Sequence, residues 1–505
     1  MTMLGMVGIM PTNCKHPQIY LRPVVKMFAA LRPGGAGFEV RRPLDRTETW
    51  FAVLVAAIND MRGVSKGNLQ VQSPAKVMAC NDCMIEGHWI KCYHTTVYLS
   101  AVRYLPMDDV LRARYKRAFS RCTKFKVMAD ELPATPITDE YVRLAMADAD
   151  LSPRPLSSKR HPRWEFGFAG TSVFVKYLPY WEPWMMNFRD TDHMLLNRLR
   201  VIIGLLNGSG NLKMNKAKMT LEMSLGSRLR GYRDSLPDSG KWPNPPWKAT
   251  KEERKFIDEV LPHLTRLPQS VNDGKMPAFF TDTLTFADAN LFFSGLGKII
   301  ISLCPSLGIH QRAALNALID ATAPVLMPVL FRSDLPALQL AMARAQTRCE
   351  IHLPLAFNTM AQHAFLEVFE PSRGRVIRAG SCTHFHMAAM ERFNKKLRSL
   401  LTQMKSPAVH LMMSWRRLNM TELYRVAHPA DHFPTVPGRS TVMGAAREGA
   451  ALDAPDYILA EHKVRLRGQT KLIYMTDVQR ERVHLWFLDN DAAYARAHAK
   501  LRGIT

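Results

Sequence analysis

Apolar residues recur at helical spacing through residues 171–369, and this block constrains the fold of the chain more than any other feature. Pro-rich breaks, of which KWPNPPW at Lys241–Trp247 is the clearest, separate its segments. We expect helices at Asp192–Asn207, Ala249–Leu264, Thr285–Leu303, Ile309–Leu326 and Leu335–Leu353. The pattern therefore predicts a mainly α-helical domain.

A shorter apolar run, Trp50–Ile58 (WFAVLVAAI), is stopped by Asn59 and Asp60. Its length and branched side chains predict a strand buried on both faces, although a buried helical segment shows the same pattern. Ligand-facing residues emerge at strand ends in layered α/β folds, so Asp60 is a candidate site residue. The alternative is that Asn59 and Asp60 form a turn or a helix cap.

The chain has 68 Lys and Arg against 44 Asp and Glu, which gives a formal net charge of +24. This excess predicts a polyanionic partner, with nucleic acid before an anionic membrane. No window approaches the ~20 apolar residues of a membrane-spanning helix, so we expect no membrane span. The N-terminal apolar run lacks the preceding basic region of a signal peptide, so we do not expect one. Eight cysteines in 505 residues are too few for a disulfide scaffold, so we expect a reducing compartment with thiols or a metal site.

Three of the cysteines lie in the segment CNDCMIEGHWIKCYH. Cys80 and Cys83 have the spacing of a chelating pair, and Cys92 with His94 follows within reach, so these four residues are candidate ligands of Zn²⁺. His88 is a competing ligand. The second pair is irregular, and thiols without a metal remain the alternative interpretation.

The segment Arg103–Lys126 is strongly basic. Helical spacing places Arg114, Arg117 and Arg121 on one face, with Tyr115 and Phe119 interleaved. This face could contact phosphates or simply be a solvated helix face. The candidate DNA-binding residues, including two from a later helix, are Arg112, Arg114, Lys116, Arg117, Arg121, Lys395 and Lys396.

That later helix is Phe385–Met404, a strongly amphipathic segment that carries Glu391 in its first half. Taken alone, Glu391 is most simply a solvent-facing carboxylate among Lys and Arg.

Four separated stretches together resemble the CACTA, or En/Spm-like, DNA transposases. They are INDMRGVSKGNL (58–69) with the cysteine segment and RYLPMDDVLRARYKRAF (103–119), VFVKYLPYWEPWMMNFRDTDHMLLNRLRVIIGLLNG (173–208), PPWKATKEERKFIDEVL (245–261), and IHLPLAF (351–357) with AMERFNKKLRSLL (389–401). The resemblance spans roughly residues 9–420, and the shared order and spacing of the motifs make it fairly specific.

The resemblance implies an RNase H-like core with an Asp-Asp-Glu triad that binds Mg²⁺ and cuts and joins DNA. Carboxylates suit hard Mg²⁺, and two ions about 4 Å apart can activate the nucleophile and hold the leaving oxygen. Asp60 matches the second Asp and Glu391 the helical Glu, so both are expected catalytic and Mg²⁺-binding residues. Asp190 and His193 match the family's Asp-x-x-His motif, although Asp190 could equally cap the helix that follows it.

The expected fold class is α/β plus α: a partial RNase H-like core of mixed sheet and helices, interrupted by a large all-α insertion, with a small cysteine/histidine knuckle. The expected layout is a partial core with the second-Asp strand (1–75), the knuckle and basic segment (76–130), a linker (131–170), the helical insertion (171–369), the Glu-bearing helix completing the core (370–420) and a basic C-terminal region (421–505). His352 and His363 are interpreted as ordinary helix-end or core histidines.

The family's first Asp lies in an Asp-Gly pair on a strand well upstream of Asp60, and this chain begins too late to contain it. Asp45 precedes Asp60 but has no strand-end context. We therefore expect a truncated, transposase-derived protein that binds DNA, with the transposon ends as the family-implied partner, but does not transpose by itself. The alternatives are a non-catalytic DNA-binding protein with vestigial acidic residues and a decayed coding fragment. A nuclear location is expected, with a weak basic signal at SSKRHPR (157–163), and a homo-oligomer or a partner transposon protein is possible.

Overall fold

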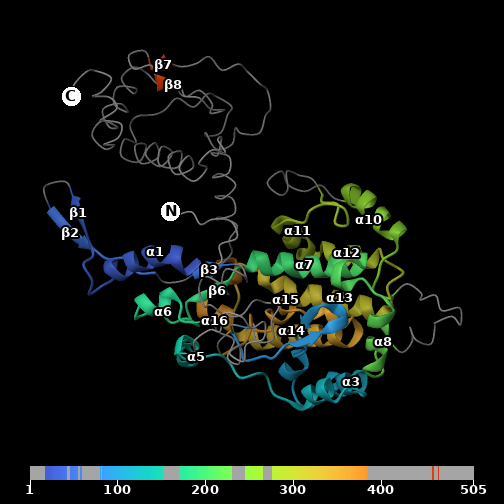
Figure 1. Cartoon of the computed structure of the whole chain (residues 1–505). Helices are drawn as coiled ribbons and strands as arrows, with labels where there is room; N and C mark the ends of the chain where they lie inside the picture. Colours follow the sequence, from blue (N-terminus) through green and yellow to red (C-terminus); the bar gives the residue numbers. More distant parts are fainter. Residues whose placement is uncertain are drawn as a thin grey trace, which may run out of the picture. The chain divides into compact units, whose positions relative to one another are not determined.

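The computed structural model describes residues 17–42, 46–54, 57–59, 80, 82–151, 170–229, 245–264, 276–372, 374–384, 458–459 and 464–465 (Figure 1). The chain divides into two compact units, Met1–Glu391 and Arg392–Thr505. In the second unit the described residues form one antiparallel pair, β7 (Ile458–Leu459) with β8 (Val464–Arg465). The predicted helix Phe385–Met404, and with it Glu391, Lys395 and Lys396, lies outside the described residues.

The described part of the first unit is mostly helical, and its larger helices lie where the apolar periodicity predicts them. These helices are α7 (Thr191–Asn207), α8 (Lys216–Ser224), α10 (Lys251–Leu264), α11 (Phe286–Leu291), α12 (Gly297–Ser302), α13 (Ile309–Thr322) and α14 (Leu335–His352). Four of the five predicted helices are confirmed, with boundary shifts of a few residues, and α8 is an additional helix. α13 and α14 pack side by side (Figure 1).

The segment predicted as one helix at Thr285–Leu303 is interrupted in its middle. A π-helical turn, η8 (Phe292–Leu296), separates α11 from α12, and Gly295 adopts a φ of 132° there. Only glycine reaches this φ without strain, so Gly295 permits the kink between the two helices.

The N-terminal described residues form α1 (Pro17–Leu31) and an antiparallel hairpin of β1 (Phe38–Arg42) with β2 (Arg46–Trp50). The prediction of a single buried strand over Trp50–Ile58 is wrong. Trp50 ends β2, residues 51–54 are in no strand, and Phe51 and Val53 are exposed. Apolar character alone does not fix burial when no neighbouring strand covers both faces.

One small parallel pair links two distant parts of the sequence. β3 (Ala57–Asn59) pairs with β6 (Asn187–Arg189), with Ala57 opposite Asn187 and Asn59 opposite Arg189. Each of the four sheets among the described residues has two strands. The mixed sheet of an RNase H-like core is therefore not confirmed, and the described architecture is helical with small sheets.

The main core runs from Tyr93 to Cys382 and combines apolar side chains of α3 (Val110–Ala118), α7, α13 and α14. The residues predicted as a linker include helix α5 (Asp139–Leu151), which packs its buried face in a small cluster of its own. The remaining short elements are β4 (His88–Ile90), η2 (Lys91–Tyr93), β5 (Thr95–Val97), η3 (Ala101–Tyr104), α4 (Thr123–Lys126), η4 (Val127–Asp130), α6 (Val173–Tyr177), η6 (Gly210–Leu212), η9 (Ala323–Leu326), η10 (Arg332–Asp334), η11 (Leu355–Phe357), α15 (Met360–His363), α16 (Arg375–Ala379) and η12 (Cys382–His384). Among the described helices, none combines the length and the apolar character that crossing a bilayer requires.

Candidate metal centre

Cys80, Cys83 and His363 converge on one buried point of the first unit. One ligand atom from each, the two Sγ atoms and a ring nitrogen, all lie within 4.8 Å of one another. Cys83 is held by an isolated β-bridge to Pro136, and His363 is the last residue of α15. The fold thus joins a local Cys-x-x-Cys pair to a histidine 280 residues after Cys83.

The two ring nitrogens of His363 have different partners, and one of them faces the thiols. His363 Nε2 lies 3.2 Å from Cys83 Sγ, and His363 Nδ1 lies 2.9 Å from Ser100 Oγ. Metal-binding histidines commonly bond their second nitrogen in this way, which fixes the tautomer and the ring orientation. Tyr98 stacks on the same ring, with centroids 6.0 Å apart.

A buried arginine, Arg189, lies next to the Cys80 thiol. Cys80 Sγ accepts hydrogen bonds at 3.5 Å from Arg189 Nη2 and from the Asp82 amide. Burial raises the pKa of the Cys80 thiol, but the hydrogen bond with Cys83 and the charges of Arg189 and His363 outweigh it, and the net pKa is well below the usual value. The pKa of Cys83 shifts the other way, because burial and the neighbouring Cys80 raise it.

Asp82 compensates the arginines. Its carboxylate lies 3.4 Å from Arg189 Nη2, 3.4 Å from Arg375 Nη2 and 3.0 Å from Arg378 Nη2. Burial raises the pKa of Asp82, but the three guanidinium groups lower it far more and keep the carboxylate ionised. Three cations thus surround one carboxylate, and one of them, Arg189, also contacts the Cys80 sulfur.

The donor set fits a soft or borderline metal ion. Two sulfurs and an imidazole nitrogen are the ligand types of zinc sites, whereas Mg²⁺ and Ca²⁺ prefer oxygen. Cys80, Cys83 and His363 are all buried, and their ligand atoms face one another. The cluster can therefore hold a structural metal ion.

The two other predicted ligands lie elsewhere. Cys92 is half-buried in η2, where burial raises its pKa, and His94 is exposed at the end of that turn with a φ of 49°. Neither belongs to the group formed by Cys80, Cys83 and His363. Cys92 packs against the main core, which contains the buried Tyr93, whereas Cys80 and Cys83 belong to a separate apolar cluster.

The competing ligand His88 is also outside the group. Its ring packs against Phe125 with centroids 5.3 Å apart, and burial lowers its pKa to about 4. The histidine that does join the cysteines, His363, was expected to be an ordinary core residue. Local spacing could not identify it, because the ligand is supplied by a helix far away in the sequence.

Asp190 acts as the N-cap of α7. Its carboxylate accepts hydrogen bonds from the amides of Asp192 and His193, each at 3.2 Å, and it also contacts His193 Nδ1. This confirms the capping alternative and explains the spacing of the Asp-x-x-His motif, since a capping residue reaches the third residue after it. The ring of His193 packs edge-on against Phe286, with centroids 4.7 Å apart.

The basic segment separates into inward and outward residues. Arg114 and Arg117 are exposed on α3, as the helical spacing predicts, whereas Arg121 is exposed in the turn after the helix ends. Tyr115 and Phe119 are fully buried and offer no ring to a base. The inclusion of Arg112 is wrong, because this side chain is buried. It donates to the backbone carbonyls of Arg103, Leu105, Pro106, Ala129 and Glu131.

Lys116, the remaining candidate on α3, forms an ion pair with Asp130 on the protein surface. The predicted residues Asp60, Glu391, Lys395 and Lys396 lie outside the described residues.

Comparisons with known proteins add no relative. No protein-family model, no curated protein and no solved structure matches the chain.

Proposed function

We propose that the chain is a DNA-binding protein derived from a cut-and-paste transposase of the Asp-Asp-Glu type, stabilised by a buried zinc centre. The resemblance of its motifs to the CACTA transposases is the starting point. Two observations support it: the strands of two of those motifs pair with each other, and a group of arginines at α3 is exposed.

The observation that carries the proposal is the parallel pairing of β3 with β6. β3 ends at Asn59, the first residue of the Asn-Asp motif, and β6 directly precedes the Asp-x-x-His motif. Asn59 lies opposite Arg189 in the register. Parallel strands present their carboxyl ends at one edge, which is where α/β folds hold ligands. In the sequence an aspartate follows each strand, Asp60 after β3 and Asp190 after β6. Two motifs that each resemble a motif of the CACTA transposases are thus joined by the pairing of their strands.

The surface that would bind DNA is the exposed face of Arg114, Arg117 and Arg121. Arginines contact backbone phosphates, and each neutralised phosphate releases counterions, so binding weakens steeply with salt. Because the aromatic residues of α3 are buried, we expect backbone contacts rather than base stacking.

Binding is tested by fluorescence anisotropy of duplex DNA over a range of salt concentrations, with and without Mg²⁺. We expect salt-dependent binding that does not require Mg²⁺. The triple variant Arg114→Gln, Arg117→Gln, Arg121→Gln should reduce the salt slope by about 1 per residue that contacts phosphate. The matched control replaces exposed Lys213, Lys216 and Lys251 by Gln, which removes the same charge from another surface. An equal loss in both triples would refute a localised binding face.

Cleavage is tested by nicking of a supercoiled plasmid with Mg²⁺ or Mn²⁺. The resemblance supplies two acidic positions, Asp60 and Glu391, where a triad needs three, so we expect the 505-residue chain to bind without cutting. Nicking by the wild type that is lost in both Asp60→Ala and Glu391→Ala would show that these carboxylates are working ligands. The expectation of an inactive site would then be wrong.

The zinc centre would serve the fold. Zinc bound to Cys80, Cys83 and His363 supplies a cross-link between the cysteine segment and α15, without taking part in DNA cleavage. Ser100 holds the imidazole, and Arg189 with the Asp82 amide holds the Cys80 sulfur. Metal analysis of the purified chain, with Cys83→Ser as the control, tests this part. We expect zinc in the wild type and its loss in the variant.

A further inference from the structure

A fourth side chain, which is acidic, lies at the edge of the cluster of Cys80, Cys83 and His363. Glu367 follows His363 by four residues, and the backbone between them continues in a turn in which the Leu366 amide donates to the His363 carbonyl at 2.9 Å. Residues four apart on such a turn share a face. Glu367 is only 8% exposed, so its carboxylate is directed into the protein.

The carboxylate of Glu367 lies beside the imidazole of the cluster. Glu367 Oε1 is 4.0 Å from His363 Nε2, the nitrogen that also lies 3.2 Å from Cys83 Sγ. Zinc bonds of ~2.0–2.3 Å in a tetrahedron put neighbouring ligand atoms about 3.3–3.8 Å apart. The measured spacings, 3.2 Å from Cys83 Sγ to His363 Nε2 and 4.0 Å from there to Glu367, bracket that range.

Structural zinc is four-coordinate, whereas the group of Cys80, Cys83 and His363 provides three ligands. We propose that Glu367 is the fourth ligand, which makes the cluster a closed Cys₂-His-Glu zinc site. This inference rests on the zinc centre proposed above and specifies its composition.

The surroundings of Glu367 match those of a ligand held in place. Tyr104 donates its hydroxyl hydrogen to Glu367 Oε1, as Ser100 bonds His363 and Arg189 bonds Cys80. Outer partners of this kind orient metal ligands and are nearly as important as the ligands themselves. Each of these three candidate ligands thus has a polar partner that can fix its direction.

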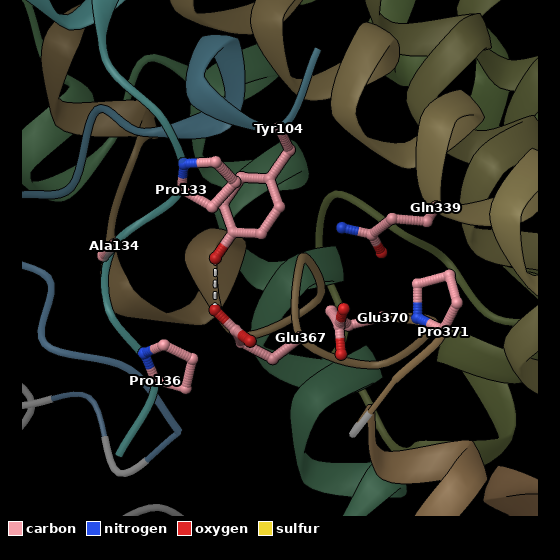
Figure 2. A pocket seen from close by; sticks show the side chains of 8 residues that line it. All are labelled: Tyr104, Pro133, Ala134, Pro136, Gln339, Glu367, Glu370 and Pro371. Atoms are coloured by element: carbon pink, nitrogen blue, oxygen red, sulfur yellow. Dashed lines mark hydrogen bonds between the residues drawn. The ribbon is translucent and has the colours of Figure 1, made fainter. Parts of the chain in front are cut away.

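Glu367 also faces a pocket. It lines a pocket of about 240 Å³ together with Tyr104, Gln339, Glu370 and three prolines. Figure 2 shows Glu367 at the wall of this pocket, with its hydrogen bond to Tyr104. Glu367 therefore lies next to both this pocket and the imidazole of His363.

The test compares Glu367→Gln with Glu370→Gln. Glu370 is a matched control because it lines the same pocket but is bound by Ser372 on the exposed side. Zinc affinity is measured by competition with a chromophoric chelator, and coordination by the visible spectrum of the Co²⁺-loaded chain. We expect Glu367→Gln to weaken zinc binding at least about 10–100-fold, the loss seen when even an outer partner is removed. Glu370→Gln should match the wild type.

Glu367→His separates ligation from packing, because imidazole can also bind zinc. We expect this variant to recover most of the affinity and a tetrahedral Co²⁺ spectrum. If Glu367→Gln does not fold, Glu367→His decides alone: recovered binding supports the proposal, and absent binding overturns it. Binding by Glu367→Gln equal to that of the wild type also overturns it.

The control variants distinguish a wrong assignment of Glu367 from the absence of a zinc centre and from a wrong proposed function. Loss of zinc in Cys83→Ser with normal zinc in Glu367→Gln would keep the zinc centre but reject Glu367 as a ligand. A wild type without zinc would reject both the centre and Glu367. Salt-dependent DNA binding, measured on the same samples, tests the proposed function independently of either result.

Discussion

Arginine side chains occupy opposite environments in two regions of this protein. Around Asp82, the guanidinium groups of Arg189, Arg375 and Arg378 are buried and paired with one carboxylate. On α3 and in the turn directly after it, Arg114, Arg117 and Arg121 are exposed to solvent. The first group is buried beside the candidate metal centre, and the second faces solvent.

The comparison shows that formal charge overstates the positive surface. Among the described residues, the buried arginines are Arg112, Arg189, Arg198, Arg228 and Arg375. Their guanidinium groups are occupied by backbone carbonyls, by Asp82, by Glu222 or by aromatic faces such as Phe365 under Arg198. These charges contribute to the +24 of the chain but not to a DNA-binding surface.

The largest expected effect is the loss of the carboxylate in the buried group. Asp82→Asn leaves three buried guanidinium groups without their anion, which we expect to lower the free energy of unfolding by about 3–5 kcal/mol. Urea unfolding monitored by circular dichroism measures this change. Asp108→Asn, at an exposed carboxylate, should stay within about 0.5 kcal/mol. Equal stability of the two variants would mean that the buried arginines need no counter-charge.

The buried carboxylates differ in the direction of their pKa shifts: that of Asp82 is lowered, whereas that of Glu350 is raised. Burial raises the pKa of Glu350 to about 7, although the amides of Ala101 and Ser100 donate to its Oε1. A raised folded-state pKa means that stability is full below the unfolded pKa of about 4.3 and falls as the pH rises to about 7. The loss over that window should be about 3–4 kcal/mol.

Glu350→Gln isolates this contribution, because an amide keeps the oxygen that accepts from Ala101 and Ser100 but cannot ionise. Measured as unfolding free energy against pH, the difference between the variant and the wild type should increase in favour of the variant from about pH 4 to pH 7 and then level off. A difference that does not change with pH would show that Glu350 is not destabilised by its burial.

The sequence predicted the helices well because their signal is local. In α7, α13 and α14 the apolar residues recur within single turns, and Asp190 marks the start of α7 as a capping residue. The kink at Gly295 and the interrupted run after Trp50 were missed. Both depend on how neighbouring elements pack, which a window of a few residues does not contain.

The candidate metal centre can be predicted only in part for the same reason. Cys80 and Cys83 form a local motif, but the third member, His363, comes from a different element and has no distinctive neighbours in the sequence. Proximity in the sequence instead favours Cys92 and His94, with His88 as a competing ligand. Spacing identifies ligands on one turn, whereas ligands from separate elements are joined only by the fold.

Within α3 the comparison can be tested one turn at a time. Arg112→Met keeps the apolar stem but leaves buried carbonyls of Leu105 and Ala129 without a donor, so we expect a loss of about 2 kcal/mol. Arg114→Met, the exposed neighbour, should change stability by less than about 0.5 kcal/mol. Urea midpoints measured side by side give the contrast. A larger effect at Arg114 than at Arg112 would reverse the assignment of inward and outward faces.

The smallest expected change in stability is in the variant with the largest expected effect on binding. Replacing Arg114, Arg117 and Arg121 by Gln removes exposed charges from a strongly basic chain, so the free energy of unfolding should change by at most about 0.5 kcal/mol and is as apt to rise as to fall. Thermal unfolding at low and high salt measures this. Because self-repulsion is screened by salt, any stabilisation should be largest at low salt. A strong destabilisation would place these arginines in the structural class with Arg112, and weaker DNA binding by the variant would then reflect a damaged fold rather than a lost phosphate contact.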